Sequence, residues 1–86
     1  MKTAELQLEL GRAYRAKKPR NSGGLVNDRT IVWIGTFEVQ YDGPAVKFGS
    51  KYPRISKEDF RAWAERDVTD ELPKGEYANW PIESNK

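Results

Sequence analysis

Cysteine and histidine are both absent from this chain of 86 residues. Without a thiol, the chain can form no disulfide, no thiolate zinc site and no cysteine nucleophile. Without an imidazole, it lacks the commonest metal ligand and the side chain that titrates closest to neutral pH. Because no glycine-rich phosphate-binding motif is present either, we expect a protein that is not an enzyme, has no evident small-molecule substrate and holds no metal or cofactor.

Long apolar runs are also missing. No stretch approaches the ~20 residues of a membrane span, and Glu5, Gln7 and Glu9 interrupt the leucines near the N-terminus, where a signal peptide would be continuously apolar. We therefore expect a cytoplasmic protein with no membrane partner. A length of 86 residues predicts one small domain over residues 1–86. Hydrophobic residues make up only 37% of the chain, so much of the core volume is expected from three Trp, four Tyr and three Phe.

Acidic residues are scarce in the first two thirds of the chain. Residues 1–57 hold eleven Lys/Arg against five Asp/Glu, a balance of +6, whereas residues 58–86 hold four against eight, a balance of −4. Five cations fall within nine positions that contain no acid: Arg12, Arg15, Lys17, Lys18 and Arg20. Such a cluster is typical of a surface that contacts a polyanion or an acidic protein. It is equally typical of a solvated helix C-terminus whose cations oppose the helix dipole.

Residues 3–18 combine two patterns. Leu6, Leu8 and Leu10 alternate with polar residues, which is a strand pattern. The composition of the segment, with acids early and bases late, favours a helix. We predict a helix that ends before Pro19. A flexible basic loop containing two glycines is expected to follow over residues 19–28.

Residues 29–41 carry the strongest strand pattern of the chain. Gly35 either bends this strand or divides it into two. A turn over residues 42–44 is expected to lead into a short returning strand over residues 45–48. An extended edge segment over residues 52–55 should follow, because Pro53 cannot donate to a central ladder.

Ser56 is expected to cap a second helix that ends near Asp67, since acids occupy the first turn after it. Residues 68–86 are predicted to form an irregular acidic tail with one short turn at residues 69–72. Three apolar residues are expected to pin this tail to the body: Tyr77, Trp80 and Ile82. The order predicts a small α+β domain with an N-terminal helix, an antiparallel sheet of two or three strands, a second helix and an irregular C-terminal tail.

A second group of cations surrounds the Gly49-Ser50 turn: Lys47, Lys51, Arg54 and Lys57. A basic hairpin followed by a helix is how a wing touches DNA. The stretch GPAVKFGSKYPRISKEDFRAWA, residues 43–64, resembles the wing and following helix of small phage excisionase-like DNA-binding proteins. Those proteins place a helix-turn-helix before the wing, where this chain has the β-rich residues 30–41, so we do not assign it to that family. Lysines on a hairpin edge also serve to block edge-to-edge pairing.

These observations favour a small non-enzymatic protein associated with nucleic acid or transcription, of the kind encoded by phages, plasmids or mobile elements. Its phosphate contacts are predicted at eight residues: Arg12, Arg15, Lys17, Lys18, Arg20, Lys47, Lys51 and Arg54. The alternative is an inhibitor or adaptor that docks on a host protein through its aromatic hairpin edge or acidic helix and tail, with contacts at Tyr41, Tyr52, Glu65 and Asp67. A third hypothesis is a self-assembling protein guided by its opposite charges.

Overall fold

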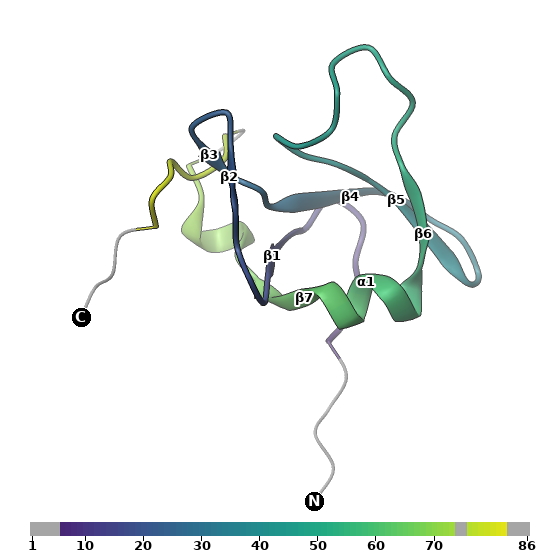
Figure 1. Ribbon diagram of the computed structural model, residues 1–86. Coiled ribbons are helices and arrows are strands. Elements are labelled where there is room, and N and C mark those ends of the chain that lie inside the picture. Colours follow the sequence, from purple (N-terminus) through teal and green to yellow (C-terminus); the bar gives the residue numbers. More distant parts are fainter. Residues whose placement is uncertain (1–5, 74–75, 83–86) are drawn as a thin grey trace, which may run out of the picture.

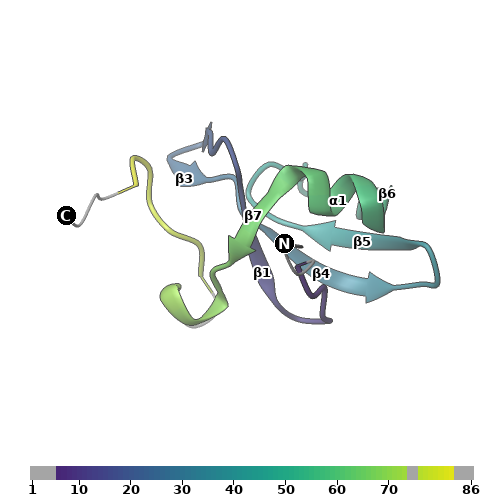
Figure 2. The same ribbon diagram turned by 90° about the horizontal axis from the view of Figure 1, so that it is seen from below.

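The computed structural model describes residues 6–73 and 76–82, and most of its regular structure is antiparallel sheet. Five strands form the main sheet in the order β6-β5-β4-β1-β7 (Figure 1). They are β1 (Ala13–Ala16), β4 (Arg29–Ile34), β5 (Glu38–Asp42), β6 (Arg54–Ser56) and β7 (Ala64–Asp67). A small second sheet pairs β2 (Asn21–Ser22) with β3 (Leu25–Val26). The helix α1 (Lys57–Trp63) packs against β5, β6 and β7 (Figure 2), and a 3-10 turn, η1 (Thr69–Glu71), follows β7.

The α+β prediction with two helices is therefore wrong, and the N-terminal helix is its main error. Residues 3–5 of the predicted helix lie outside the described residues, residues 6–12 form no helix, and Ala13–Ala16 form β1, which pairs with β4 on one side and with β7 on the other. All four residues of β1 are buried, so the strand shows no alternation of apolar and polar residues. Helix propensity is worth only tenths of a kcal/mol per residue, and pairing along both edges of a buried strand outweighs it.

The structure decides between the two alternatives at Gly35 and corrects one prediction in the hairpin region. Gly35 divides two strands rather than bending one, and its N–H donates to the carbonyl of Glu38 at 2.8 Å across the β4–β5 turn. The predicted strand over residues 45–48 does not form, because β5 pairs directly with β6. Residues 43–53 instead make a loop with two local turns, so the likeness to a wing hairpin is not retained in the structure.

The second helix begins as predicted and ends early. Ser56 is its N-cap, and the Ser56 hydroxyl accepts from the Asp59 N–H at 3.0 Å. The helix ends at Trp63 rather than near Asp67, because the next four residues leave it in an extended conformation and pair with β1 as β7. The short turn expected at residues 69–72 is confirmed by η1. Within the described residues, no helix is long and apolar enough to cross a membrane.

The core lies between the sheet and α1. Its buried members are Tyr14, Ile31, Val39, Phe60 and Ala64. The Phe60 ring meets the Tyr14 ring edge-on at 5.4 Å between centroids. The chain after η1 returns to the β2–β3 hairpin, where the Val26 N–H donates to Ala78 and the Trp80 N–H donates to Gly24, both at 2.9 Å. The hydroxyls of Tyr77 and Thr30 lie 2.7 Å apart, which ties the tail to β4.

Candidate functional site

Arg15 is almost fully buried, and its guanidinium is paired with a carboxylate. Its Nε and Nη2 each donate to a carboxylate oxygen of Asp28 at 2.9 Å. Arg15 is 7% exposed and Asp28 is 1% exposed. The bidentate pair joins β1 to the residue that precedes β4, so its role is to hold the fold together.

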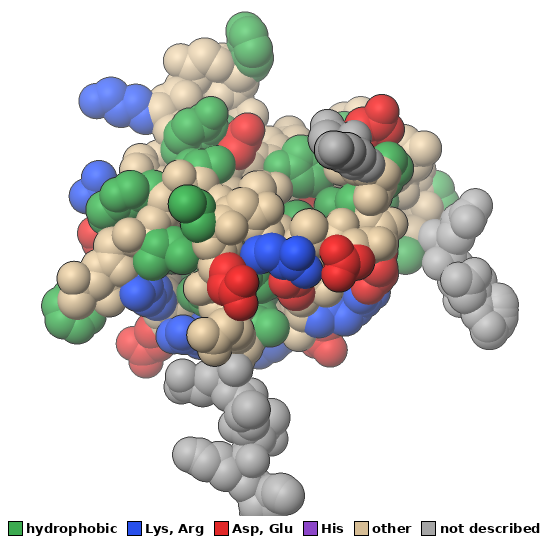
Figure 3. Space-filling view, turned by 180° about the vertical axis from the view of Figure 1, so that it is seen from behind, with side chains coloured by type: hydrophobic (Ala, Val, Ile, Leu, Met, Phe, Trp, Pro, Cys, Tyr) green, Lys and Arg blue, Asp and Glu red, His purple; other side chains and the backbone are tan. Residues whose placement is uncertain are grey.

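Two further predicted cations, Arg12 and Arg54, are already paired with carboxylates. Arg12 donates through Nε to Asp67 at 2.8 Å, and its Nη2 lies 3.5 Å from Asp70. The Arg54 guanidinium lies 3.8 Å from Glu38 and stacks on an exposed tryptophan of β4. Seen from behind the view of Figure 1, basic and acidic side chains lie next to one another rather than gathering by sign (Figure 3).

The Asp67 carboxylate makes the pair with Arg12 sensitive to acid. Burial would raise the pKa of Asp67, but hydrogen bonds from Arg12 and from the Thr69 hydroxyl and N–H outweigh it and hold that pKa below its usual value. The resulting stability is complete above about pH 4, the pKa of an unfolded Asp. It is lost as the pH falls through the lower pKa of the folded state.

We expect Asp67→Asn to lower the urea midpoint of unfolding at pH 7 and to lower it less at pH 2.5, which lies below the pKa of an unfolded Asp, so that part of the stability supplied by the charge has been lost. Urea unfolding followed by tryptophan fluorescence at both pH values measures the two differences. A difference that stayed constant down to pH 2.5 would contradict the assigned role of the charge.

The other five predicted cations line two adjoining cavities. Lys17, Lys18 and Arg20 line a cavity of about 310 Å³ beside Trp63, whereas Lys47 and Lys51 line one of about 190 Å³ beneath the 43–53 loop. Asn27 lines both cavities. In the described part of the chain, none of the five cations has a carboxylate within 4.0 Å.

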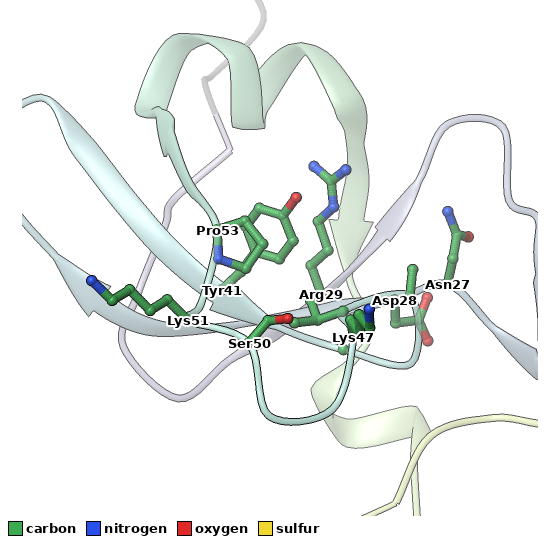
Figure 4. Close-up of a pocket in the computed structure, with 11 residues that line it drawn as sticks. Asn27, Asp28, Arg29, Tyr41, Lys47, Ser50, Lys51 and Pro53 are labelled. Atoms are coloured by element: carbon green, nitrogen blue, oxygen red, sulfur yellow. The ribbon is translucent and has the colours of Figure 1, made fainter.

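Arg29 completes this site and was missed by the sequence analysis. Its guanidinium lies 4.3 Å from the ring centroid of Tyr41 and 4.0 Å from that of Trp63. Among residues 6–73 and 76–82, no carboxylate pairs with it. Burial lowers the pKa of Arg29, only partly offset by Tyr41. In Figure 4, Arg29 rises between Tyr41 and β7, while the neighbouring Asp28 points to the other side.

We call the two cavities and their six cations the basic cleft: Lys17, Lys18, Arg20, Arg29, Lys47 and Lys51. Backbone contacts hold its parts together. The Lys17 N–H donates to the Trp63 carbonyl at 2.9 Å, and the Arg20 N–H donates to the Asn27 side chain at 2.9 Å. The cavities lined by the two predicted basic segments thus share Asn27, and Arg29, which lines one of them, packs on Trp63 of the other.

The 43–53 loop is fixed over Arg29 by close packing at its base. Gly43 lies against the Asp28 carbonyl so tightly that a Cβ at this position would overlap the carbonyl oxygen. At the other end of the loop, the Tyr41 N–H donates to Pro53 at 3.2 Å and the Gln40 amide donates to Tyr52 at 3.1 Å. The loop is thus anchored at both ends, and its Lys47 and Lys51 line the same cavity as Arg29.

The four residues predicted to contact a protein partner do not form one surface. Tyr41 packs on Arg29 within the basic cleft, and Tyr52 lies half-exposed at the end of the 43–53 loop. Glu65 is exposed on β7, the strand at the far edge of the sheet from β6, and Asp67 is engaged by Arg12. No family model, curated protein or solved structure matches this chain.

Proposed function

We propose that this protein binds nucleic acid through the basic cleft. The observation that carries the proposal is continuity: Arg29 and Asn27 connect the cations of residues 17–20 to those of the 43–53 loop. Cations that have no carboxylate partner in the described structure, and that are gathered on one surface, attract a polyanion. The phosphates of a nucleic acid would pair with these cations. Their binding would release the counterions condensed on the nucleic acid, which favours association at low salt.

The aromatic components of the cleft support the same proposal. Tyr41 and Trp63 hold the Arg29 guanidinium between their rings, so its donors are oriented before a ligand arrives. A planar guanidinium matches the geometry of two phosphate oxygens, and preorganisation lowers the entropy lost on binding. Arg12, Arg15 and Arg54 take no part in the proposed site, because each already forms an ion pair with a carboxylate of the same chain.

Reversing the charge of Lys17 or Lys18 tests the proposal. We expect Lys17→Glu and Lys18→Glu each to weaken binding about tenfold at low salt, because a phosphate contact becomes a repulsion. Each should also make the slope of log K against log salt shallower by about 0.7–0.9, the value for one lost phosphate contact. Fluorescence anisotropy with labelled oligonucleotides at 20 and 200 mM salt, as chosen conditions, measures both quantities.

The matched control is Lys57→Glu, which makes the same change in net charge outside the basic cleft. Lys57 begins α1, and its N–H donates to Phe37 next to the β4–β5 turn. This variant should bind almost as the wild type does. If all three variants lost the same amount of affinity, net charge alone would explain the effect, and the basic cleft would not be a specific site. If no oligonucleotide bound the wild type at low salt, the proposal would be wrong.

A protein-binding adaptor is the second candidate function, and one observation favours it. Phe37 is 78% exposed and Trp33 is 40% exposed, and both lie at or beside the β4–β5 turn, away from the basic cleft. Exposed aromatic residues are enriched at protein interfaces. This candidate would be supported by a stoichiometric protein partner that the wild type captures and Phe37→Ala does not.

A further inference from the structure

We propose that the basic cleft selects single-stranded nucleic acid, and that Phe48 and Tyr52 form its platform for stacking bases. This inference rests on the proposed function. It concerns the 43–53 loop, which projects from the sheet between β5 and β6 (Figure 1).

Phe48 is the first observation. Its side chain is 100% exposed at the tip of a loop that is anchored at both ends. Two internal turns order the loop, since the Val46 N–H donates to Gly43 at 3.0 Å and the Ser50 N–H donates to Lys47 at 3.1 Å. Gly49 supplies the left-handed conformation, φ +85°, that the second turn requires. The fold therefore presents an apolar ring to solvent on an ordered backbone, and no packing in the described residues accounts for it.

The order of residues along the loop is the second observation. Lys47 precedes Phe48, and Lys51 precedes Tyr52, which is 46% exposed, so each exposed ring follows a cation that has no carboxylate partner in the described structure. A single strand presents the same alternation, with an anionic phosphate followed by a flat, unpaired base. Stacking on aromatic rings combined with backbone contacts to Lys and Arg is the general mode of single-strand binding. In a duplex the bases are already stacked on one another, and the rings would have no faces to cover.

The shape of the site is the third observation. Arg29 is half-buried beside a cavity of about 190 Å³. A phosphate group on a flexible strand can enter such a cavity, whereas the backbone of a rigid duplex would rest on the outer lysines. No long exposed helix is available in the described residues to enter a major groove, because α1 has seven residues and its first turn carries Glu58 and Asp59.

An anionic membrane is the competing polyanion for an exposed phenylalanine among lysines. A flat bilayer could take Phe48 and contact Lys47 and Lys51. It would leave Arg29 unused, because that guanidinium lies recessed between Tyr41 and Trp63. Nucleic acid uses all of these groups, so it is the ligand that the arrangement favours.

The test compares a labelled 12-nucleotide single strand, as DNA and as RNA, with a duplex of the same sequence by fluorescence anisotropy. We expect at least about tenfold tighter binding of one of the single strands. Phe48→Ala and Tyr52→Ala should each weaken single-strand binding at least about fivefold, with little change on the duplex and no change in salt slope. Phe37→Ala, which removes an equally large exposed ring outside the cleft, is the control and should leave affinity unchanged.

The possible failures are distinguishable. If no oligonucleotide binds at low salt, the proposed function fails and this inference fails with it. If duplex and single strand bind equally and Phe48→Ala has no effect, the inference fails while the proposed function stands. If Phe48→Ala abolishes sedimentation with phosphatidylserine vesicles and leaves single-strand affinity intact, the loop is a membrane contact and the inference is overturned. Circular dichroism should show that every variant is folded, because exposed side chains away from special features contribute little to stability.

Discussion

Asp28→Ala is expected to lower the free energy of unfolding by about 3–5 kcal/mol, because it leaves the buried guanidinium of Arg15 without its partner. Arginine cannot escape this cost by losing its proton. The hydrogen bonds from Arg15 to Asp28 raise the pKa of the guanidinium further, even though burial acts in the opposite direction. A chain of this size has a total stability of roughly 4–13 kcal/mol, so this single substitution should remove a large fraction of it.

Two further variants separate the charge from the packing. Asp28→Asn keeps the size of the side chain and should lose most of the same stability, since an amide cannot neutralise the buried cation. The double variant Arg15→Met with Asp28→Leu removes both charges and should recover most of the loss, because a well-packed apolar pair often replaces a buried ion pair at little cost. Urea unfolding followed by tryptophan fluorescence gives the four free energies. A loss below 1 kcal/mol for Asp28→Ala would mean that water reaches Arg15.

The elements predicted correctly are those with local signals. Residues on both sides of Gly35 alternate as strands do, and Ser56 followed by two acids is a helix start that needs no distant partner. The strands β1 and β7 have no such signal. Ala13–Ala16 is buried throughout, and Ala64–Asp67 continues directly from α1 with no proline or glycine between them. β1 therefore becomes a strand through its pairing with β4 and β7, and β7 through its pairing with β1.

The site was predictable only in part for a related reason. The sequence shows which residues are cations, but whether a carboxylate pairs with a given cation depends on contacts between distant segments. Arg15 forms an ion pair with Asp28, 13 positions away in the sequence. Arg29 is the immediate neighbour of Asp28, yet it forms no ion pair in the described structure. Adjacent residues in an extended chain point to opposite sides, so the sequence neighbour of an acid is poorly placed to pair with it. Clustering along the sequence therefore overvalued Arg15 and overlooked Arg29.

Replacing Arg29 is expected to have the largest effect on binding. Arg29→Met removes a preorganised cation from the centre of the basic cleft and keeps an unbranched apolar side chain between Tyr41 and Trp63. A hydrogen bond to a charged group is worth about 1.5–3 kcal/mol, so affinity for a single strand should fall about 10- to 150-fold. Anisotropy at low salt measures the loss. The substitution loses two cation–π contacts, but it also removes the cost of burying a charge that has no carboxylate partner in the described residues. Because these effects oppose each other, the free energy of unfolding should change by no more than about 1 kcal/mol.

Arg29→Lys then divides charge from shape. An ammonium keeps the positive charge, so the salt dependence of binding should stay close to that of the wild type. It lacks the planar fork that stacks between two rings and faces two phosphate oxygens, so affinity should fall to a value between those of the wild type and Arg29→Met. Equal affinities for Arg29→Lys and the wild type would show that only charge matters at this position. Full affinity in Arg29→Met would mean that the two groups of lysines bind without the residue that joins them, and the basic cleft would then not act as one site.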